Sequence, residues 1–583
     1  MLHTLTRSLR ENKGPALVTV LLSALEVVFE IVIPLFMSNL IDFGIEGGSM
    51  AAVWKFGAFL LLLAAFQLAT GVLAARIAAR ASVGFAANLR EDMYNNVQTF
   101  AFSNIDKFST ASIVTRLTTD TTNVQNAFQM LMRMAIRAPV MLIFSMIVSF
   151  RISRDISMTF LIILPILALA LFFIIRSVFP VFTRVFRTYD ELNNVVQENV
   201  RGIRVVKSFN QERHEIGKFG AISERIYKDF SKGERLITLN APLMQFCIYT
   251  CMIVISWLGA KAIIASGNDP ALGLTTGNLT ALITYTMQIL SSLMMLSMVF
   301  AMLTISLSSA RRIAEVIEER SDIPQPEQPV MTVRDGAVDF DHVSFVYASK
   351  ADKKVLDDID LHIRSGETIG IIGGTGASKS SLVQLIPRLY DVTGGKLTLG
   401  GVDVRDYDLD TLRGAVAMVL QKNELFSGTI AENLRWGNEN ATDEQLRHAC
   451  ELACADGFIS AMPDGYDTHI EQGGTNVSGG QKQRLCIARA LLKKPKVLIL
   501  DDSTSAVDTR TDAQIQQALS TYIPDTTKII IAQRISSVQN ADRIVVLDDG
   551  HIDAVGCHDE LLRTCEIYRE VYESQQKGGE DDA

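Results

Sequence analysis

A glycine-rich stretch that ends in a lysine and two serines, "GGTGASKSS", contains residue types that bind phosphate. It follows the apolar run "ETIGII" and precedes a helical pattern, which is the strand, loop and helix context of a phosphate loop. In such a loop, backbone N–H groups and the lysine bind phosphates, and the hydroxyl after the lysine binds Mg²⁺. The stretch therefore predicts a nucleotide site formed by Gly373, Gly374, Thr375, Gly376, Ala377, Ser378, Lys379, Ser380 and Ser381.

Two neighbouring aspartates follow another continuous apolar run. The run "KVLIL" has the pattern of a strand buried on both faces, and it leads into Asp501 and Asp502. Open α/β sheets bind their ligands at the carboxyl ends of the strands, so we expect these carboxylates beside the phosphate loop. Mg²⁺ prefers oxygen ligands, and Asp501 is therefore the expected magnesium partner.

Here the chain resembles the ATP-binding cassette (ABC) family, and the resemblance covers its full length. The stretch "NVSGGQKQR", placed between the phosphate loop and the aspartates, resembles the family's signature. The resemblance implies ATP and Mg²⁺ as cofactors. It places Asp502, Gln533 and Gln421 in the catalytic group, and Gln421 with Ser380 and Asp501 at the metal. Further ATP contacts implied by the resemblance are Tyr347 of "VSFVY", Ser478, Gly479, Gly480 and Gln481 of the signature, and Asp508 of "SAVD".

Three positions depart from the family's pattern, and all belong to one hydrolytic site. The family has glycine in place of Ser378, glutamate in place of Asp502 and histidine in place of Gln533. Aspartate is one methylene shorter than glutamate, and misplacing a catalytic group by about 1 Å costs about a hundredfold in rate. Serine lacks the freedom of φ that glycine has. The resemblance thus implies a degenerate site, although family tolerance or sequence error remains an alternative for each change.

The first half of the chain is apolar enough for a membrane domain. The 583 residues are 48% hydrophobic, and their mean hydropathy of +0.22 is unusual for a soluble protein. Six runs approach the length of about 20 residues that spans a bilayer. Arg133 and Arg137 interrupt the third run, which makes it the weakest. The six runs are residues 15–41, 52–75, 133–150, 156–178, 238–265 and 279–307.

The second half alternates β-rich runs with helical patterns, which indicates an α/β domain with a largely parallel sheet. The predicted fold is therefore an α-helical transmembrane bundle of six spans, exporter-type, fused to an α/β P-loop ATP-binding cassette. Within the resemblance, residues 102–120 and 203–215 look like cytoplasmic segments that press on cassettes. We expect a transmembrane domain with long cytoplasmic extensions at 1–320, a proline-rich linker at 321–335, a nucleotide-binding domain at 336–575 and an acidic tail at 576–583.

The net charge and the distribution of lysine and arginine indicate the expected partners and the orientation of the chain in the membrane. The formal net charge of -9 argues against a nucleic-acid partner, whose binding protein would be basic. Lysines and arginines gather in the connections after the second and fourth runs, and "SGNDPALGLTTG" before the sixth run has none. The positive-inside rule then places both termini and the cassette in the cytoplasm, with the spans in the cytoplasmic membrane. Arg151 and Arg154 in the third connection run against this orientation.

Two glutamates interrupt the first apolar run. Glu26 and Glu30 are four residues apart, so they share one face of a helix near the middle of the span. Ionisable side chains at that depth are costly and often functional. Substrate contact is one interpretation. The other is a pairing with Arg133 or Arg137, or exposure to a water-filled cleft, without a substrate role.

Methionines recur along the sixth apolar run. Met287, Met294, Met298 and Met302 follow one another at spacings of seven, four and four residues, close to one helix face. Their flexible side chains suit a surface that accepts many apolar ligands. Met294 and Met298 are thus candidate substrate contacts, and helix packing or lipid contact is the alternative.

Together these features predict one half of a heterodimeric transporter that uses ATP to expel an amphipathic small molecule. The resemblance implies a second ABC half-transporter subunit as the partner, because two cassettes of this family close head to tail on ATP. Two alternatives remain: an importer of a metal-chelating compound built on the same fold, and a regulatory subunit that senses ATP without transporting. Substrate-stimulated turnover distinguishes transport from sensing.

Overall fold

Among the described residues of the first half of the chain, six long helical segments are apolar enough to cross a membrane, as the sequence predicts. By its contacts the chain divides into two units, Met1–Gln98 with Thr110–Glu319 and Thr99–Ser109 with Arg320–Ala583. The structure is a computed structural model. It describes residues 1–269, 273–347, 354–374, 376–502 and 507–580.

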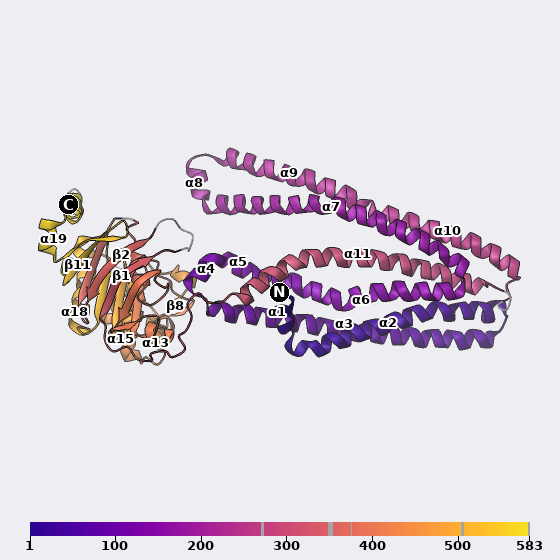
Figure 1. The fold of residues 1–583 in the computed structure, drawn as a ribbon, viewed down its shortest axis with the longest axis horizontal. Helices are drawn as coiled ribbons and strands as arrows, with labels where there is room; N and C mark the ends of the chain where they lie inside the picture. The colour runs from indigo at the N-terminus through magenta and orange to yellow at the C-terminus, as the bar shows by residue number, and fades with distance from the viewer. Residues whose placement is uncertain (270–272, 348–353, 375, 503–506, 581–583) are drawn as a thin grey trace. The chain divides into compact units, whose positions relative to one another are not determined.

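The long helices of the first unit reach well beyond a bilayer. Helix α3 has 49 residues; at about 1.5 Å per residue it is about 74 Å long, against a hydrocarbon core of about 30 Å. Helices α2 and α3 lie side by side, as do α6 and α11 (Figure 1). The long helices are α2 Lys13–Asn39, α3 Met50–Gln98, α6 Thr121–Ile152, α7 Arg154–Arg201, α9 Glu212–Thr238, α10 Asn240–Ser266 and α11 Thr276–Glu318.

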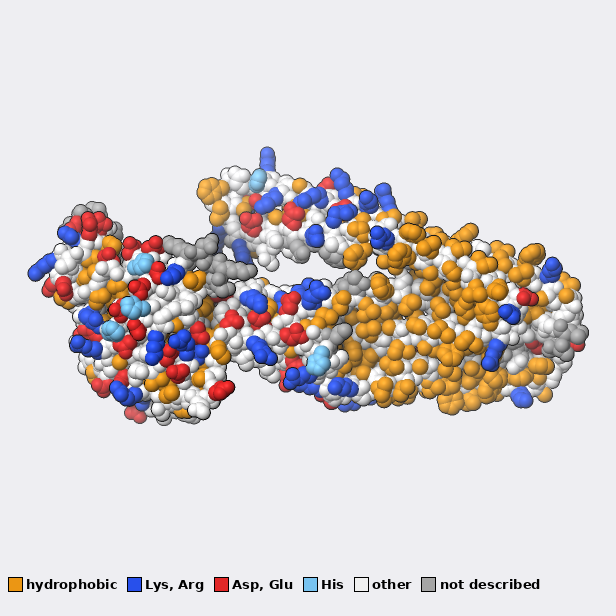
Figure 2. Space-filling model, in the orientation of Figure 1, with side chains coloured by type: hydrophobic (Ala, Val, Ile, Leu, Met, Phe, Trp, Pro, Cys, Tyr) orange, Lys and Arg blue, Asp and Glu red, His pale blue; other side chains and the backbone are white. Residues whose placement is uncertain are grey.

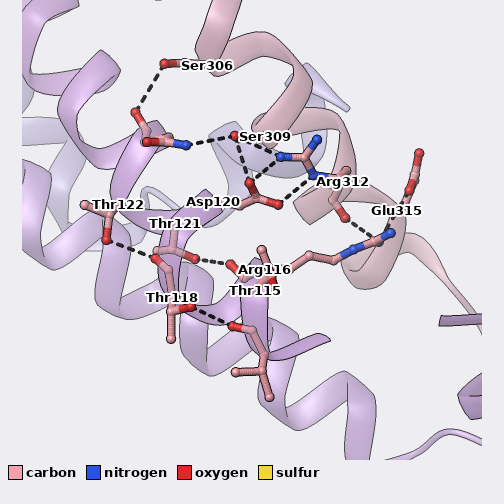
Figure 3. Close-up of polar contacts among 12 residues, drawn as sticks. Thr115, Arg116, Thr118, Asp120, Thr121, Thr122, Ser306, Ser309, Arg312 and Glu315 are labelled. Atoms are coloured by element: carbon pink, nitrogen blue, oxygen red, sulfur yellow. Dashed lines mark hydrogen bonds and ion pairs between the residues drawn. The ribbon is translucent and has the colours of Figure 1, made fainter. Parts of the chain in front are cut away.

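A buried polar cluster joins the start of α6 to the end of α11 (Figure 3). The Asp120 carboxylate is buried and accepts hydrogen bonds from Arg312 Nε at 2.7 Å and Ser309 Oγ at 2.9 Å. Arg116 Nη1 donates to the Arg312 carbonyl at 2.8 Å. Asp120 ends a short π-helix, a distortion that often marks functional sites. The short elements are α1 Leu2–Arg7, η1 Arg10–Asn12, η2 Leu40–Glu46, α5 Thr110–Thr115, η3 Arg116–Asp120 and α8 Ile203–Ser208.

The second unit is built on a six-stranded sheet in the order β12-β11-β3-β10-β9-β6. All neighbours are parallel except β12, which pairs antiparallel with β11. Strands β9 and β10 are buried throughout, as expected of a parallel sheet covered on both faces. The largely parallel sheet that the sequence predicts is confirmed. The strands are β3 Thr368–Gly373, β6 Val416–Val419, β9 Val497–Asp501, β10 Thr527–Ile531, β11 Arg543–Asp548 and β12 His551–Gly556.

A second, four-stranded antiparallel sheet, in the order β2-β1-β4-β5, was not predicted. Its longest strands alternate buried and exposed residues, so they lack the continuous apolar runs of the parallel sheet. These strands are β1 Val338–Phe345, β2 Leu356–Ile363, β4 Gly394–Leu399 and β5 Val402–Asp403, and a small pair is formed by β7 Gly428–Thr429 and β8 His469–Ile470.

Helices lie beside the sheets of the second unit, among them α13, α15, α18 and α19, which are labelled in Figure 1. The main ones are α12 Lys379–Gln384 after β3, α17 Gly479–Leu492 before β9, and α18 Thr509–Tyr522 after β9. Helix α20 continues to Glu580, so the described part of the expected acidic tail is helical. The others are α13 Leu409–Ala415, α14 Ile430–Arg435, α15 Asp443–Leu452, α16 Asp456–Ser460, η4 Gly465–Asp467, η5 Gln472–Gly474, η6 Ile535–Ser537 and α19 His558–Thr564.

One segment from between the second and third spans belongs to the second unit. Helix α4, Phe102–Phe108, lies in the stretch Thr99–Ser109 that packs with the cassette. Asn104 Nδ2 donates to the Arg320 carbonyl at 3.0 Å, and the Asp322 N–H donates back to Asn104 Oδ1 at 3.2 Å. The segment Thr99–Ser109, which follows the second span, therefore belongs to the same compact unit as the phosphate loop.

Candidate nucleotide-binding site

The phosphate loop lies between β3 and α12. Lys379 Nζ donates to the carbonyl oxygens of Gly373 at 2.8 Å and Gly374 at 2.9 Å, so the lysine is held against its own loop. Gly376 has φ +88°, a conformation that glycine adopts without steric cost. Thr375, also predicted to contact the nucleotide, lies outside the described residues. The described loop has the polar groups that a polyphosphate requires.

Ser378, the first departure from the family's pattern, occupies a left-handed backbone conformation. Its φ is +68° and its ψ is 20°. A side chain in this region costs roughly 1–2 kcal/mol, which a glycine avoids. The residue type that the family pattern has at this position is therefore the one the local geometry favours.

Charged groups meet where β9 ends beside the loop. Asp501 is buried, and its Oδ1 accepts a hydrogen bond from Ser380 Oγ at 3.0 Å. Burial raises the pKa of Asp501, as does the charge of Asp502, while the Ser380 hydrogen bond and Lys379 oppose the rise. Burial lowers the pKa of Lys379, against the opposing pull of the two carboxylates. A phosphate beside Lys379 would favour its charged form.

The three residues predicted as catalytic lie together. Asp502 Oδ2 accepts hydrogen bonds from Gln533 Nε2 at 2.8 Å and from Gln421 Nε2 at 3.3 Å. The Asp502 backbone has φ +48°, and its N–H donates to the Ile531 carbonyl at 3.0 Å. The carboxylate is buried. One of its oxygens is thus engaged by two neutral amides, an arrangement that we call the Asp502 triad.

The predicted metal ligands suit magnesium only together with a nucleotide. Ser380 and Asp501 already touch, and Gln421 reaches Asp502 beside them. Among the described residues, no group of three or more His, Cys, Asp or Glu side chains could hold a metal ion. Mg²⁺ is commonly held by one or two carboxylates together with substrate phosphates, and the oxygen donors here match that chemistry.

Aromatic rings surround the predicted adenine contact. The hydroxyls of Tyr347 and Ser381 share a hydrogen bond of 2.7 Å, which joins the ring to the phosphate-loop helix. Tyr347 is 45% exposed, so a base can approach it. Its ring meets Phe345 edge-on at 4.8 Å and Tyr390 edge-on at 5.1 Å.

Tyr390 was not predicted, and it links this aromatic group to α4. Its hydroxyl donates to Asp106 Oδ2 at 2.9 Å, and its ring meets Phe102 edge-on at 6.0 Å. A lone tyrosine after the phosphate-loop helix gives no periodic signal, so its role is evident only from the packing. Tyr347 and α4 therefore share one neighbour.

The signature residues form a helix cap. Ser478 Oγ accepts from the Gln481 N–H at 3.3 Å, and Gln481 Oε1 accepts from the Ser478 N–H at 2.9 Å, which is a capping box at the start of α17. Ser478 and Gly479 are exposed, and Gly480 is half-buried. This end of α17 is therefore open to an anion, which a helix N-terminus attracts.

Asp508 caps the next helix. It accepts hydrogen bonds from the Thr511 N–H at 2.9 Å and the Thr511 hydroxyl at 2.8 Å. These bonds, led by the backbone N–H, lower the pKa of Asp508. The Ser505 and Ala506 that precede it in "SAVD" lie outside the described residues.

Known proteins resemble both units. Residues 16–294 match the family described as ABC transporter transmembrane region, and residues 356–505 match the family described as ABC transporter. The uncharacterized ABC transporter ATP-binding protein YfiB of Bacillus subtilis is 35% identical over 558 residues, 96% of each chain. The chain belongs to the ABC transporter family. An uncharacterized ABC transporter ATP-binding protein of Mycobacterium tuberculosis is 33% identical over 580 residues, 99% of this chain and 98% of that one.

The fold of this ABC transporter matches a solved exporter. The structure of a bacterial Atm1-family ABC exporter with ATP bound superposes with a TM-score of 0.82 at 23% identity, covering 97% of this chain and 99% of that chain. The chain is thus a multi-pass membrane protein with an ATP-binding cassette, and its enzymatic activity is that of an ABC-type ATPase coupled to transport.

The candidate substrate residues of this ABC transporter lie in two settings. Arg137 Nη1 donates to Glu26 Oε1 at 2.8 Å and Arg137 Nη2 donates to Glu30 Oε2 at 2.6 Å, so the glutamates pair with one of the two arginines considered from sequence. Met294 and Met298 are 44% and 64% exposed on α11, which fits either a ligand or lipid. Hydrophobic side chains cover most of the visible face of the membrane-spanning portion of the first unit (Figure 2).

Proposed function

We propose that this chain is the degenerate half of a heterodimeric ABC exporter that expels amphipathic small molecules. Its phosphate loop holds ATP with Mg²⁺ at Ser380, Asp501 and Gln421, and hydrolysis occurs chiefly at the partner's loop. The distribution of lysine and arginine along the chain supports cytoplasmic termini and a cytoplasmic cassette in the plasma membrane. The exposed methionines of α11 support an amphipathic ligand.

The Asp502 triad is the observation that carries this proposal. A general base must reach the attacking water at hydrogen-bond distance. Here the carboxylate is shorter than the glutamate of the family pattern, and its Oδ2 is already bonded to two amides. Lys379 contacts the phosphate loop and Ser380 contacts Asp501, which supports nucleotide and metal binding by these three residues. The site is therefore built to hold ATP more than to hydrolyse it.

The intact signature supports a strong second site. Ser478, Gly479 and Gln481 form a regular cap at an exposed helix start, which an approaching γ-phosphate of another chain can reach. We expect the partner to carry glycine before its phosphate-loop lysine, glutamate after its magnesium aspartate and histidine at its switch. We expect its own signature to depart from S-G-G-Q. A neighbouring gene with the same three departures would contradict the asymmetric pair.

Steady-state ATP hydrolysis by the purified full-length chain in nanodiscs tests the proposal. We expect slow turnover by this chain alone, retention of bound ATP, and substrate-stimulated turnover once the partner is added. Lys379→Ala is the control, because it should abolish ATP retention. Turnover by the single chain at the rate of the pair would contradict the proposal, and so would a pair whose turnover no transported compound stimulates.

A further inference from the structure

Helix α2 carries a proline inside its membrane-spanning length. Pro34 is part of the regular helix and is buried. Proline has no N–H group, so the carbonyl of Glu30, four residues earlier, lacks its ordinary partner within the helix. A membrane-spanning helix tolerates such a gap where a neighbouring helix bonds the freed carbonyl.

Helix α11 supplies that bond and a second one beside it. Gln288 Nε2 donates to the Glu30 carbonyl at 3.3 Å, and the Tyr285 hydroxyl donates to the Ile31 carbonyl at 2.6 Å. Tyr285 is fully buried, so water does not reach its hydroxyl in this arrangement. Both carbonyls belong to the turn that changes shape when a helix bends at a proline. The two bonds from α11 therefore fix the bend of α2.

The two parts of α2 that meet at Pro34 are bound to different helices. Before the proline, Glu26 and Glu30 pair with Arg137 of α6. After the proline, residues 35–46, which we call the distal segment, are bound to α11. The two parts can thus follow different neighbours when the helices move.

Polar bonds join the distal segment to the start of α11. Ser38 Oγ donates to Asn278 Oδ1 at 3.1 Å. The Asp42 carboxylate accepts from the Thr275 hydroxyl at 2.7 Å and from the Gly277 N–H at 2.8 Å. We call these three bonds the clasp. Hydrogen bonds to water can replace them on opening, so the clasp can break and re-form at modest cost.

We propose that Pro34 is a hinge of the transport cycle, about which the distal segment swings away from α11, and that Tyr285 and Gln288 hold it closed. The hinge bends easily because the helical hydrogen bond at that turn is already absent. Opening then costs the two bonds from α11 and those of the clasp. The inference rests on membrane transport by this family and holds whether or not the phosphate loop is degenerate.

A substitution at Pro34 separates this hinge from plain helix packing. In Pro34→Ala, the new N–H group at residue 34 bonds the Glu30 carbonyl within α2. That carbonyl then no longer depends on Gln288, and α2 loses its point of bending. If Gln288 acts only through packing, its replacement has the same effect with proline or with alanine at residue 34.

The distance between two spin labels in the full-length chain in nanodiscs measures the opening. One label replaces Ile45 of the distal segment and the other replaces Ile264 of α10, residues that are 64% and 82% exposed. Ser266 Oγ at the end of α10 donates to the Leu274 carbonyl at 2.9 Å, so the second label reports on the start of α11. Noncanonical amino acids carry the labels, and the native cysteines stay in place.

We expect Gln288→Met to raise the ratio of open to closed distances about fivefold, the effect of one lost hydrogen bond. In the Pro34→Ala background, the same change should alter the ratio less than about twofold. Pro34→Ala alone should lower the ratio. Ser145→Ala removes the bond of 3.2 Å from α6 to Gln288 Oε1 and should act equally in both backgrounds. Equal effects of Gln288→Met in both backgrounds, or an unchanged ratio in Pro34→Ala, would overturn the hinge.

Tyr285→Phe keeps the test decisive if Gln288→Met fails to fold. It retains the buried ring and removes only the hydroxyl, so the ratio should again rise about fivefold. The control is Ser292→Ala, which removes a buried hydroxyl whose bond, 2.6 Å to the Gln288 carbonyl, lies within α11 and should leave the ratio unchanged. An unchanged ratio in Tyr285→Phe would also overturn the hinge. ATP hydrolysis and transport by the assembled pair are scored separately, so a failure of the proposed function is distinguishable from a failure of the hinge.

Discussion

In the function that we propose, Asp502 is the residue on which ATP hydrolysis at this site depends most. The strand β9 delivers it to the phosphate loop, and the amides of Gln533 and Gln421 hold one of its oxygens. Neither amide can take up or release a proton at ordinary pH. These two amides therefore hold the shortened carboxylate in place and cannot exchange protons with it.

Asp502→Glu should raise ATP hydrolysis. The added methylene moves the carboxylate by about 1.5 Å, a distance that can change a catalytic rate by about a hundredfold. We expect at least about a tenfold gain in the single chain, with turnover raised or redistributed in the assembled pair. Steady-state kinetics measures it, with the exposed Asp406→Glu as the matched control. A rate unchanged in both settings would show that Asp502 does not limit hydrolysis.

Ser378→Gly should stabilise the cassette. The left-handed backbone costs a serine about 1–2 kcal/mol, and the greater freedom of glycine in the unfolded chain returns about 0.4–1 kcal/mol of that. The net gain should raise the midpoint of the cassette's thermal transition by about 1–4 °C. Calorimetry of the full chain measures it, and the transition that ATP shifts identifies the cassette. The control is Ser380→Gly, which places glycine inside α12 and should lower the midpoint of the transition. A lower midpoint in Ser378→Gly as well would contradict backbone strain at Ser378.

The candidate site residues are predictable from sequence because their chemistry and their order along the chain single them out. Strand ends and loops bring together Asp501, Asp502 and Gln533 in any sheet of this kind. The hydrogen bonds around Asp502, the φ of Ser378 and the choice of Arg137 over Arg133 depend on side-chain packing across helices and strands, and no spacing in the sequence encodes them.

Helix α4 shows how a short element can join a unit other than that of its sequence neighbours. The Tyr390 hydroxyl bonds Asp106, and the same ring packs against Tyr347. The length of their apolar runs made the six spans predictable from sequence. Helix α4 and the strands of the antiparallel sheet are too short or too polar to give a comparable signal. Their places depend on contacts between distant parts of the chain.

Tyr390→Phe should loosen α4 and leave the ring packing intact. The lost hydrogen bond is worth about 1 kcal/mol, which corresponds to roughly fivefold faster opening of the segment. Hydrogen exchange over residues 99–109 measures it. Tyr568→Phe, which removes a hydroxyl bonded to His558, is the control and should leave this segment unchanged. Unaltered exchange in Tyr390→Phe would mean that the hydroxyl does not hold α4.

The contact between Asp120 and Arg312 should couple α6 to α11. Asp120 is buried, while the Arg312 side chain is 45% exposed, so solvent reduces the ion pair to about 1 kcal/mol. A double-mutant cycle with Asp120→Asn and Arg312→Gln, read by thermal unfolding of the full chain, measures the coupling. Additive effects would assign the stability to the helix packing instead.

At the scale of the whole molecule, the proposed function gives this chain a phosphate loop that hydrolyses ATP poorly and a signature that forms a regular helix cap. Among the described residues, the side chains of Ser478 and Gln481 form hydrogen bonds only within their own cap, and Ser478 and Gly479 are exposed. In the proposed pair, one nucleotide site retains ATP and the other hydrolyses it. The partner supplies the phosphate loop of the hydrolysing site, and this chain supplies the signature of that site.

Site-resolved retention of nucleotide tests this division most directly. The assembled pair is loaded with photoreactive ATP labelled at the γ-phosphate, allowed many turnovers, illuminated, and separated into its two chains. We expect this chain to keep the γ-label while the partner loses it, and Asp502→Glu to shorten that retention. Loss of the γ-label from both chains at the same rate would contradict the degenerate site.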